Sequence, residues 1–377
     1  MKTKIFIFSN FYKPGFLAGG PIQSVHNLSN LMANDLNIYI YTQNFDFNQK
    51  QYPYKITKDQ WIKQDNFSNV CYQNQFKYHF ASWIQLFKVK PDVIYLNSLF
   101  SIATHTNLIQ AIIYALFYRC KIIIAPRGEL EQGALSIKPL KKKLFIAIFR
   151  TLNQFKLYFH ATTPQEAEDI KQKLVTTKVI LAHNVPQKMI ENHQKAKEEM
   201  NSNFVFVSRI SPKKNLLFAL QCFHKLQIIG EIQFSIIGPF EDGIYWKQCE
   251  TLISKLPKNI SCKILGPLQH NAIIEALKNN HFMFFPTLGE NYGHVIYEAL
   301  SNGLPVLISN QTPWENNQKN AIFAHSLTDE IKFIETLTKL HALNNNDFSI
   351  LSQNAFTFAQ KHVDFDKLKT QYKQLFE

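Results

Sequence analysis

The sequence predicts an α/β protein of two doubly wound lobes, each built on a parallel sheet that helices cover. Three observations support this: the length, the alternation of short apolar runs with helical patterns, and the restart of that alternation halfway along the chain. The chain has 377 residues, which is enough for two domains, and 46% of them are hydrophobic, which excludes a disordered protein. Strands that alternate with helices favour parallel sheets.

The first series of elements begins at the N-terminus and is assigned to a lobe of residues 1–183. It opens with the apolar run KIFIFS, and the pattern IQSVHNLSNLMA follows with apolar residues at helical spacing. Further strands are expected in NIYIYT, DVIYLN, KIIIAP, LYFHAT and KVILAH.

The second series begins with FVFVS and is assigned to a lobe of residues 184–360. Its further strands are expected in FSIIG, CKILG, FMFFP and PVLIS, with helices in LFALQCFHKLQ, WKQCETLISKL, NAIIEALKN and VIYEALSNG. The polar stretch 183–203 is the expected linker. Residues 361–377 are expected to form a final helix that returns to the first lobe. Ligands should bind between the lobes, at the carboxyl ends of the strands.

The charge of the chain is lopsided. Residues 1–183 hold 22 Lys and Arg against 10 Asp and Glu, whereas the rest is nearly neutral, and the net charge is +13. A basic half suits nucleic acid, an anionic membrane or a phosphorylated substrate. Without a dedicated motif, nucleic acid is not expected as a partner. The five cysteines include no CxxC pair and no segment resembles a membrane span, so a cytoplasmic protein with reduced thiols is expected.

The strongest functional signal is the segment FFPTLGENYGHVIYEALSNGLPVLIS. A strand ends at Pro286, a loop presents Glu290, and a helix begins near Gly293, where exposed backbone N–H groups suit a phosphate. Glu298 follows eight positions after Glu290, inside that helix. Carboxylates on either side of such a turn can bind hydroxyls on both sides of a diphosphate. The spacing alone also fits a loop carboxylate and a solvent-facing helix glutamate, but the whole segment favours the functional interpretation.

Two further segments could contact the same ligand. Arg209 and Lys214 follow a strand in FVFVSRISPKKN, where two cations can neutralise a leaving diphosphate, although an isolated pair of this kind is usually solvated. Gly19 and Gly20 lie between the first strand and the first helix, where the backbone can approach a ligand closely. There is no GxGxxG fingerprint, and a lone pair of glycines also fits an ordinary tight turn.

Five segments together resemble the retaining glycosyltransferases of family 4, within the group 1 glycosyltransferases: AGGPIQSVHNL, SRISPKKNL, FSIIGPFEDG, ILGPL and PTLGENYGHVIYEALSNGLPVLIS. The resemblance spans nearly the whole chain. It implies the GT-B fold, in which two Rossmann-like lobes place parallel sheets across a cleft. It also implies transfer of a hexose, with retention, from a UDP- or GDP-linked sugar to an acceptor hydroxyl. No metal is implied at the diphosphate, and no other cofactor.

The resemblance implies a role for each matched residue. Glu290 would contact the donor sugar and Glu298 the ribose, while Arg209 and Lys214 would bind the diphosphate. The other residues implied in donor binding are Gly19, Gly20, Gly238, Leu268, Asn291, Tyr292, Gly293, His294 and Val295.

One position departs from the family pattern. Many members have His-Gly after the fifth strand of the first lobe, whereas this chain has Arg127-Gly128. Arg127 is then expected either near the donor's sugar or phosphate, as a catalytic residue, or in a structural contact with Glu129 or Glu131.

The triplet DFD at 364–366 matches a metal-binding motif of a different glycosyltransferase architecture. Because it precedes the helical pattern KLKTQYKQLF, Asp364 or Asp366 is expected to cap the final helix instead. No other cluster has metal-ligand spacing. The alternatives that stay open are a GT-B epimerase or phosphorylase, and a non-catalytic protein that binds nucleotide sugars.

The segment 138–159 combines a basic cluster with an apolar helical face. Lys138, Lys141, Lys142 and Lys143 precede apolar residues at positions 145, 148, 149, 152 and 155. An ordinary helix that packs this face on its own lobe explains the apolar residues, with the lysines solvated. In the family the first lobe holds the acceptor, often a lipid-linked phosphate. The cluster therefore favours peripheral binding to an anionic membrane face, with a lipid-linked or surface-polysaccharide precursor as acceptor.

Overall fold

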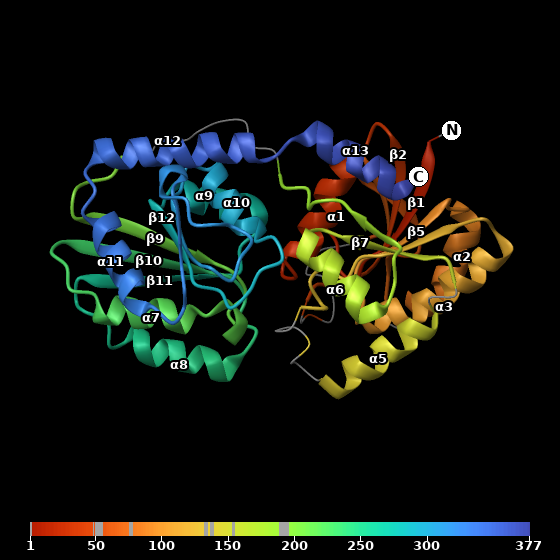
Figure 1. Ribbon diagram of the computed structural model, residues 1–377, viewed down its shortest axis with the longest axis horizontal. Helices are drawn as coiled ribbons and strands as arrows, with labels where there is room; N and C mark the ends of the chain where they lie inside the picture. Colours follow the sequence, from red (N-terminus) through yellow and green to blue (C-terminus); the bar gives the residue numbers. More distant parts are fainter. Residues whose placement is uncertain are drawn as a thin grey trace. The chain divides into compact units, whose positions relative to one another are not determined.

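The computed structural model describes residues 2–47, 49, 56–74, 78–131, 135, 139–152, 155–187 and 196–377 (Figure 1). The chain divides into two compact units. Unit 1 comprises Met1–Val185 together with Asp364–Glu377, and unit 2 comprises Pro186–Val363. The boundaries expected from the sequence, after residues 183 and 360, lie within three residues of these.

Unit 1 is built on an eight-stranded sheet with the order β3-β4-β2-β1-β5-β6-β7-β8. Its strands are β1 Thr3–Phe8, β2 Leu36–Gln43, β3 Trp61–Asp65, β4 Ser68–Gln73, β5 Val93–Leu96, β6 Lys121–Ile124, β7 Leu157–Ala161 and β8 Val179–Leu181. All neighbouring strands are parallel except the edge pair of β3 and β4, which is antiparallel. The sequence patterns did not predict β3 and β4, because polar residues interrupt both.

Helices cover both faces of this sheet: α1 Gly20–Leu31, α2 Tyr78–Val89, α3 Ile102–Phe117, α5 Pro139–Thr151, α6 Pro164–Leu174 and α13 Phe365–Phe376. The central strand β1 shows why both faces of the sheet need to be covered. Phe6 and Phe8 point into one hydrophobic core, and Ile5 and Ile7 point into a second core on the opposite face. Successive side chains of a strand alternate between faces, so a strand that is apolar throughout must be buried on both.

The last helix, α13, packs on unit 1. Its residues Tyr372, Leu375 and Phe376 lie in the second core. The Asp364 carboxylate accepts a hydrogen bond from the Lys367 backbone N–H at 2.9 Å and caps the helix, which confirms the prediction for the DFD triplet. On the exposed side, Asp35 pairs with Lys369 and Lys373 of the helix at 2.8 and 2.7 Å.

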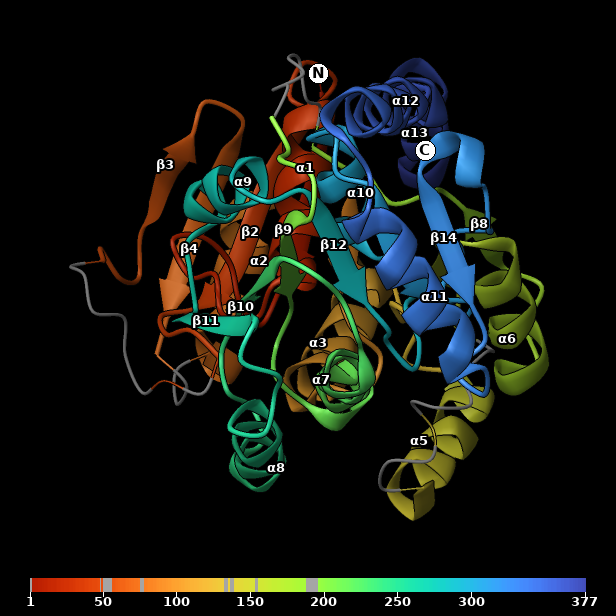
Figure 2. The ribbon, with the colours of Figure 1, turned by 90° about the vertical axis from the view of Figure 1, so that its left-hand side faces the viewer.

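Unit 2 has a six-stranded, wholly parallel sheet with the order β11-β10-β9-β12-β13-β14. The strands are β9 Asn201–Val207, β10 Glu231–Ile237, β11 Ile260–Gly266, β12 Phe282–Phe285, β13 Val306–Ser309 and β14 Ile322–His325. The helices are α7 Leu216–Lys225, α8 Gly243–Ile253, α9 His270–Lys278, α10 His294–Ser301, α11 Glu330–His341 and α12 Asn345–His362. Figure 2 shows α7 and α8 below this sheet and α9, α10 and α12 above it.

The expected linker 183–203 extends too far at its C-terminal end, because β9 already begins at Asn201. Polar residues open this central strand, and other parts of unit 2 satisfy them. The Ser202 Oγ lies 3.0 Å from His341 Nδ1, and the Asn203 N–H donates to His281 Nδ1 at 3.0 Å. Within the described residues, no helix is both long and apolar enough to span a membrane.

Candidate functional site

The central strands of unit 2 bring the predicted loops together. β9 pairs with β12, so the segments that follow them leave the same edge of the sheet side by side. The first segment holds Arg209 and Lys214, and the second holds Glu290 and Gly293. Residues that are about 80 positions apart in the sequence therefore become neighbours.

Hydrogen bonds fix these two loops to each other. Asn215 Nδ2 donates to the Pro286 carbonyl at 2.9 Å, and the Leu288 N–H donates to the Lys213 carbonyl at 2.9 Å. Asn215 has a left-handed backbone, with φ 60°, and stands at the N-cap of α7. Asparagine tolerates this conformation better than most residues. These bonds hold the two loops against each other.

Lys214 and Glu290 form a direct ion pair between the two loops. Their side chains are only 14% and 15% exposed, so the pair is largely shielded from water. The Thr287 hydroxyl also donates to Glu290 Oε1 at 3.3 Å, and the Glu290 N–H donates to the Gln311 carbonyl at 3.1 Å. The ion pair thus holds the two predicted charged side chains next to each other.

Arg209 lies in a second, more exposed ion pair. Its Nη1 donates to Glu241 Oε1 at 2.9 Å, and the two side chains are 36% and 30% exposed. Glu241 comes from the segment after β10, which neighbours β9. Glu241 was not predicted as the partner of Arg209, since a glutamate in a loop is common.

Gly293 forms the turn before α10. Its φ is +75°, and an added Cβ would lie 2.8 Å from Ile296 Cδ1. The N-cap residue of α10 is Gly293 itself, which has no side chain to cap the helix. An uncapped helix N-terminus offers backbone N–H groups and a partial positive charge to an anion. The predicted residues Asn291, His294 and Val295 are half-buried around this turn.

Glu298 is buried inside α10, and burial raises the pKa of its carboxyl to about 8. Oε1 of this carboxyl lies 3.9 Å from Nδ1 of His270, the first residue of α9. The other ring nitrogen of His270 lies 2.5 Å from Gln187 Oε1. His270 gave no signal in the sequence, because one histidine without a paired pattern is usually structural.

The remaining predicted donor residues of unit 2 shape its surface. Gly238 follows β10 with φ +142°, and an added Cβ would lie 1.8 Å from the Ser208 carbonyl oxygen, so only glycine fits there. Leu268 is half-buried against the core. The Tyr292 carbonyl accepts a hydrogen bond from Trp314 Nε1 at 2.6 Å, and burial raises the pKa of the Tyr292 hydroxyl.

In unit 1, Gly19 ends the loop between β1 and α1, and Gly20 is the first residue of α1. Gly19 has φ +65° and precedes the helix, and no atom lies within 4 Å of the position that a Cβ would take. The carboxylate of Asp46 fixes this loop, because it accepts from the N–H groups of Phe16 at 2.6 Å and Leu17 at 2.9 Å. Asp46 follows β2 in the chain, so its role depends on a contact that the sequence does not reveal.

Arg127 lies in the turn after β6 with φ +55°. Its guanidinium donates to Asn97 Oδ1 at 2.9 Å, Asn184 Oδ1 at 2.7 Å and the Tyr95 hydroxyl at 2.8 Å. The expected structural contact with Glu129 or Glu131 is therefore wrong. Neutral groups at the end of β5 and after β8 hold Arg127 instead, and most of its donors are used inside unit 1.

Glu129 has different partners. Its carboxylate accepts from Ser98 Oγ at 2.8 Å and from the N–H groups of Leu99 at 2.5 Å and Phe100 at 3.0 Å. It thus satisfies backbone donors just before α3, which explains why it is not available to Arg127.

The basic cluster lies on α5, except for Lys138, which is outside the described residues. Lys141 and Lys143 are exposed, and Lys142 Nζ lies 5.3 Å from the centre of the Phe100 ring. Only part of the expected apolar face packs on unit 1: Phe149 is buried, whereas Ile148 is 43% exposed. Leu140 and Leu144 are 81% and 63% exposed, and with Ile148 they form one stripe at four-residue spacing.

Among the described residues, no group of three or more His, Cys, Asp or Glu side chains could hold a metal ion.

We predict that replacing Glu298 with glutamine changes how stability depends on pH. Because the folded protein raises the pKa of this carboxyl from 4.5 to about 8, the native state holds its proton more tightly than the unfolded chain does. The free energy of unfolding must then fall as the pH rises through this interval. Thermal melts of wild type between pH 5 and 9 should show this loss.

The Glu298→Gln variant should lose less stability over that range, and the exposed control Glu315→Gln should behave like wild type. A Glu298→Gln variant whose melting temperature falls as steeply as that of wild type would contradict the assignment.

Comparisons with known proteins agree with the architecture. Residues 187–345 match the family model of the group 1 glycosyl transferases. A search of curated proteins gives no match.

Solved structures match over the whole chain at low identity. The sucrose-phosphate synthase of Thermosynechococcus elongatus aligns with a TM-score of 0.73 and 13% identity, over 100% of this chain and 98% of that chain. HepE of Anabaena, in complex with UDP and glucose, aligns with a TM-score of 0.72 and 14% identity, over 99% of both chains. WaaG, a glycosyltransferase involved in lipopolysaccharide biosynthesis, aligns with a TM-score of 0.67 and 12% identity, over 99% of both. Residues 187–345 are thus similar to the group 1 glycosyl transferases, in a chain that has the GT-B fold.

Proposed function

We propose that this protein is a retaining glycosyltransferase that moves a hexose from a UDP- or GDP-linked sugar to an acceptor hydroxyl. The observation that carries the proposal is the Lys214–Glu290 ion pair beside the uncapped start of α10. A cation, a carboxylate and the N-terminus of a helix at one sheet edge suit a ligand with a diphosphate and a hydroxyl-rich sugar. The UDP in the HepE structure makes UDP-sugars the first donors to test.

The chemistry follows from where charge develops. As the bond between the sugar and the diphosphate breaks, negative charge grows on the departing phosphate and positive charge grows on the sugar ring. Lys214, Arg209 and the N-terminus of α10 stabilise the phosphate without a metal ion. Glu290 binds sugar hydroxyls, and donor binding releases Lys214 from it toward the diphosphate.

Retention follows from attack on the same face that the phosphate leaves. The acceptor hydroxyl is the nucleophile in this proposal, and its proton passes to the departing phosphate. Side chains of unit 2 then have only to bind the donor and to stabilise the developing charge. Interactions that strengthen in the transition state contribute most to the rate.

We further propose that the acceptor is a lipid-linked or surface-polysaccharide precursor, and that α5 of unit 1 lies on an anionic membrane face on the cytoplasmic side. The exposed stripe of Leu140, Leu144 and Ile148 supports this, because exposed Lys141 and Lys143 flank it. Apolar side chains beside cations suit the boundary between headgroups and acyl chains. Each cation near an anionic leaflet contributes about 1 kcal/mol.

Replacing Glu290 with glutamine should remove most sugar transfer while the fold is kept. Glutamine has nearly the same shape but loses the carboxylate that binds the sugar. Release of nucleotide from UDP- and GDP-sugars, measured with EDTA and with and without acceptor, tests this. The control Glu250→Gln, at an exposed position of α8, should keep wild-type activity. Wild-type turnover in Glu290→Gln would refute the site, and dependence on Mg²⁺ or Mn²⁺ would refute the metal-free mechanism.

Co-sedimentation with liposomes tests the membrane proposal. Wild type should bind vesicles that contain anionic lipid, and binding should weaken as salt is added, because surface charges are screened. The variant with Lys141, Lys142 and Lys143 changed to Glu should bind much less. Changing Lys255, Lys258 and Lys263 of unit 2 to Glu alters the charge equally and should leave binding intact. Equal binding to neutral vesicles, or none to anionic ones, would contradict the proposal.

A further inference from the structure

Unit 1 has a large hollow at the amino ends of its central strands. It encloses about 1240 Å³ and is lined by residues at or just before the starts of β1, β5, β6 and β7, by the end of α3 and by the end of α13. The Gly19 loop and the Arg127 turn follow the carboxyl ends of β1 and β6, so this hollow lies at the opposite edge of the same sheet. Among the residues that the structure describes, none of the predicted donor or acceptor residues lines it.

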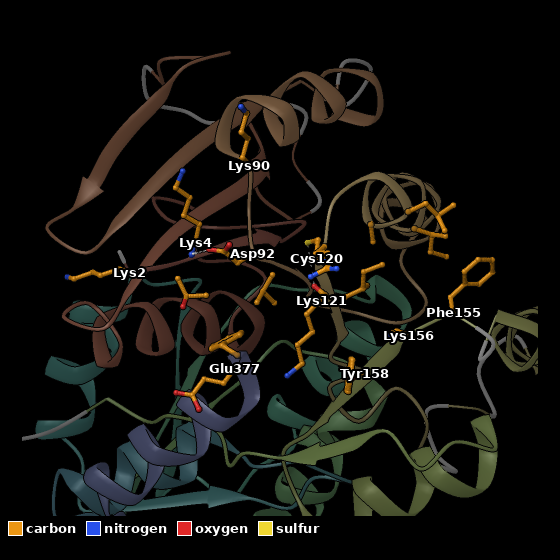
Figure 3. A pocket seen from close by; sticks show the side chains of 18 residues that line it. Lys2, Lys4, Lys90, Asp92, Cys120, Lys121, Phe155, Lys156, Tyr158 and Glu377 are labelled. Carbon is orange, nitrogen blue, oxygen red and sulfur yellow. Dashed lines mark hydrogen bonds between the residues drawn. The ribbon is translucent and has the colours of Figure 1, made fainter.

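The lining of the hollow is strongly cationic. Its six basic residues are Lys2, Lys4, Lys90, Arg119, Lys121 and Lys156, against two acidic ones, Asp92 and Glu377. One Asp92 oxygen already accepts a hydrogen bond from the Lys4 N–H at 2.8 Å. Figure 3 shows Lys2, Lys4 and Lys90 on one side of the hollow and Lys156, Phe155 and Tyr158 on the other. The positive charge is therefore spread along the hollow and is only partly neutralised.

Helix ends explain some of these cations. Lys4 Nζ donates to the Val89 carbonyl at the end of α2, and Lys121 Nζ donates to the Leu375 carbonyl in α13, at 3.1 and 3.0 Å. Cations are favourable at helix C-termini. Each ammonium has three N–H donors, so donors remain. Burial lowers the pKa of Lys121, as expected for an incompletely compensated cation.

Three of the cations lack such an explanation. The side chains of Lys90, Arg119 and Lys156 are exposed and have no hydrogen-bond or ion-pair partner within the described part of the chain. Like charges along one hollow repel each other, so their arrangement costs free energy unless an anion binds. Apolar side chains, among them Ile112, Leu116 and Phe155, complete the lining. A wall of this kind lowers the local dielectric and strengthens contacts between charges.

We infer that this hollow binds a ligand with two or more phosphate groups, at a site separate from the donor site. Several phosphates match cations that are spread along the hollow, and charge-assisted hydrogen bonds from Arg and Lys are the strong contacts for such groups. The ligand is either a soluble oligophosphate or the headgroups of phospholipids. The inference does not depend on the proposed transferase activity.

The test is lysine acetylation, read by mass spectrometry, with inorganic tripolyphosphate as the soluble probe and phosphatidylglycerol vesicles as the membrane probe. The protein is first saturated with UDP, so that the tripolyphosphate does not compete at the proposed donor site. Lys90 and Lys156 should become at least tenfold less reactive with one of the two probes, whereas exposed Lys255 and Lys258 of unit 2 should not change. Protection by tripolyphosphate identifies a soluble ligand, and protection by vesicles alone identifies lipid headgroups.

Calorimetry of tripolyphosphate binding provides the second measurement. The variant with Lys90, Arg119 and Lys156 changed to Gln should bind at least tenfold more weakly than wild type. The variant with Lys255, Lys258 and Lys263 changed to Gln has lost the same charge and should bind like wild type. Absence of protection with both probes, or equal weakening in both variants, would overturn the inference. UDP titrated into the same proteins measures binding at the donor site independently. Failure of the proposed function can therefore be distinguished from failure of this inference.

Discussion

The ion pair between Lys214 and Glu290 is the contact on which the candidate site depends. It joins the segments after β9 and β12, which are adjacent only because the sheet places these two strands at its centre. Removing one partner would leave the other charge largely buried, which is costly. The hydrogen bonds from Asn215 and Leu288 join the same two loops and help to position the charged groups.

Two glycines of unit 2 also allow segments to pack closely where a side chain would collide. Gly238 allows the segments after β9 and β10 to meet, because a side chain there would collide with the Ser208 carbonyl. Gly293 allows the sharp turn into α10, whose start is left without a side-chain cap. The positive charges of unit 1 are arranged differently. They are spread over α5 and over the hollow at the amino edge of the sheet, which accounts for much of the basic half of the chain.

Sequence patterns predicted the elements whose apolar runs are continuous. β12 and the apolar parts of β1 and β9 are such runs, and they are buried in the sheets. β3 could not be predicted, because its sequence WIKQD is mostly polar and it pairs on one side only. In the candidate site, Glu290, Lys214 and Gly293 were identifiable because they cluster in short segments next to predicted strands.

The residues that the sequence did not reveal act through contacts between distant segments. Asp46 fixes the loop before α1, Glu241 pairs with Arg209, and His270 approaches Glu298. For Arg127, the expected partners were its sequence neighbours, whereas Tyr95, Asn97 and Asn184 of other segments bind it. Only the fold decides which of these polar groups meet.

We propose that the loops after β9 and β12 form a binding site for a nucleoside diphosphate. Calorimetric titration of UDP into wild type and the Lys214→Met variant tests it most directly, with Lys225→Met as a control that loses the same charge from an exposed ion pair. Loss of a charge-assisted contact costs roughly 1.5–3 kcal/mol, so Lys214→Met should bind UDP about tenfold or more weakly, and the control should bind like wild type. Equal UDP affinity in wild type and Lys214→Met would contradict the account.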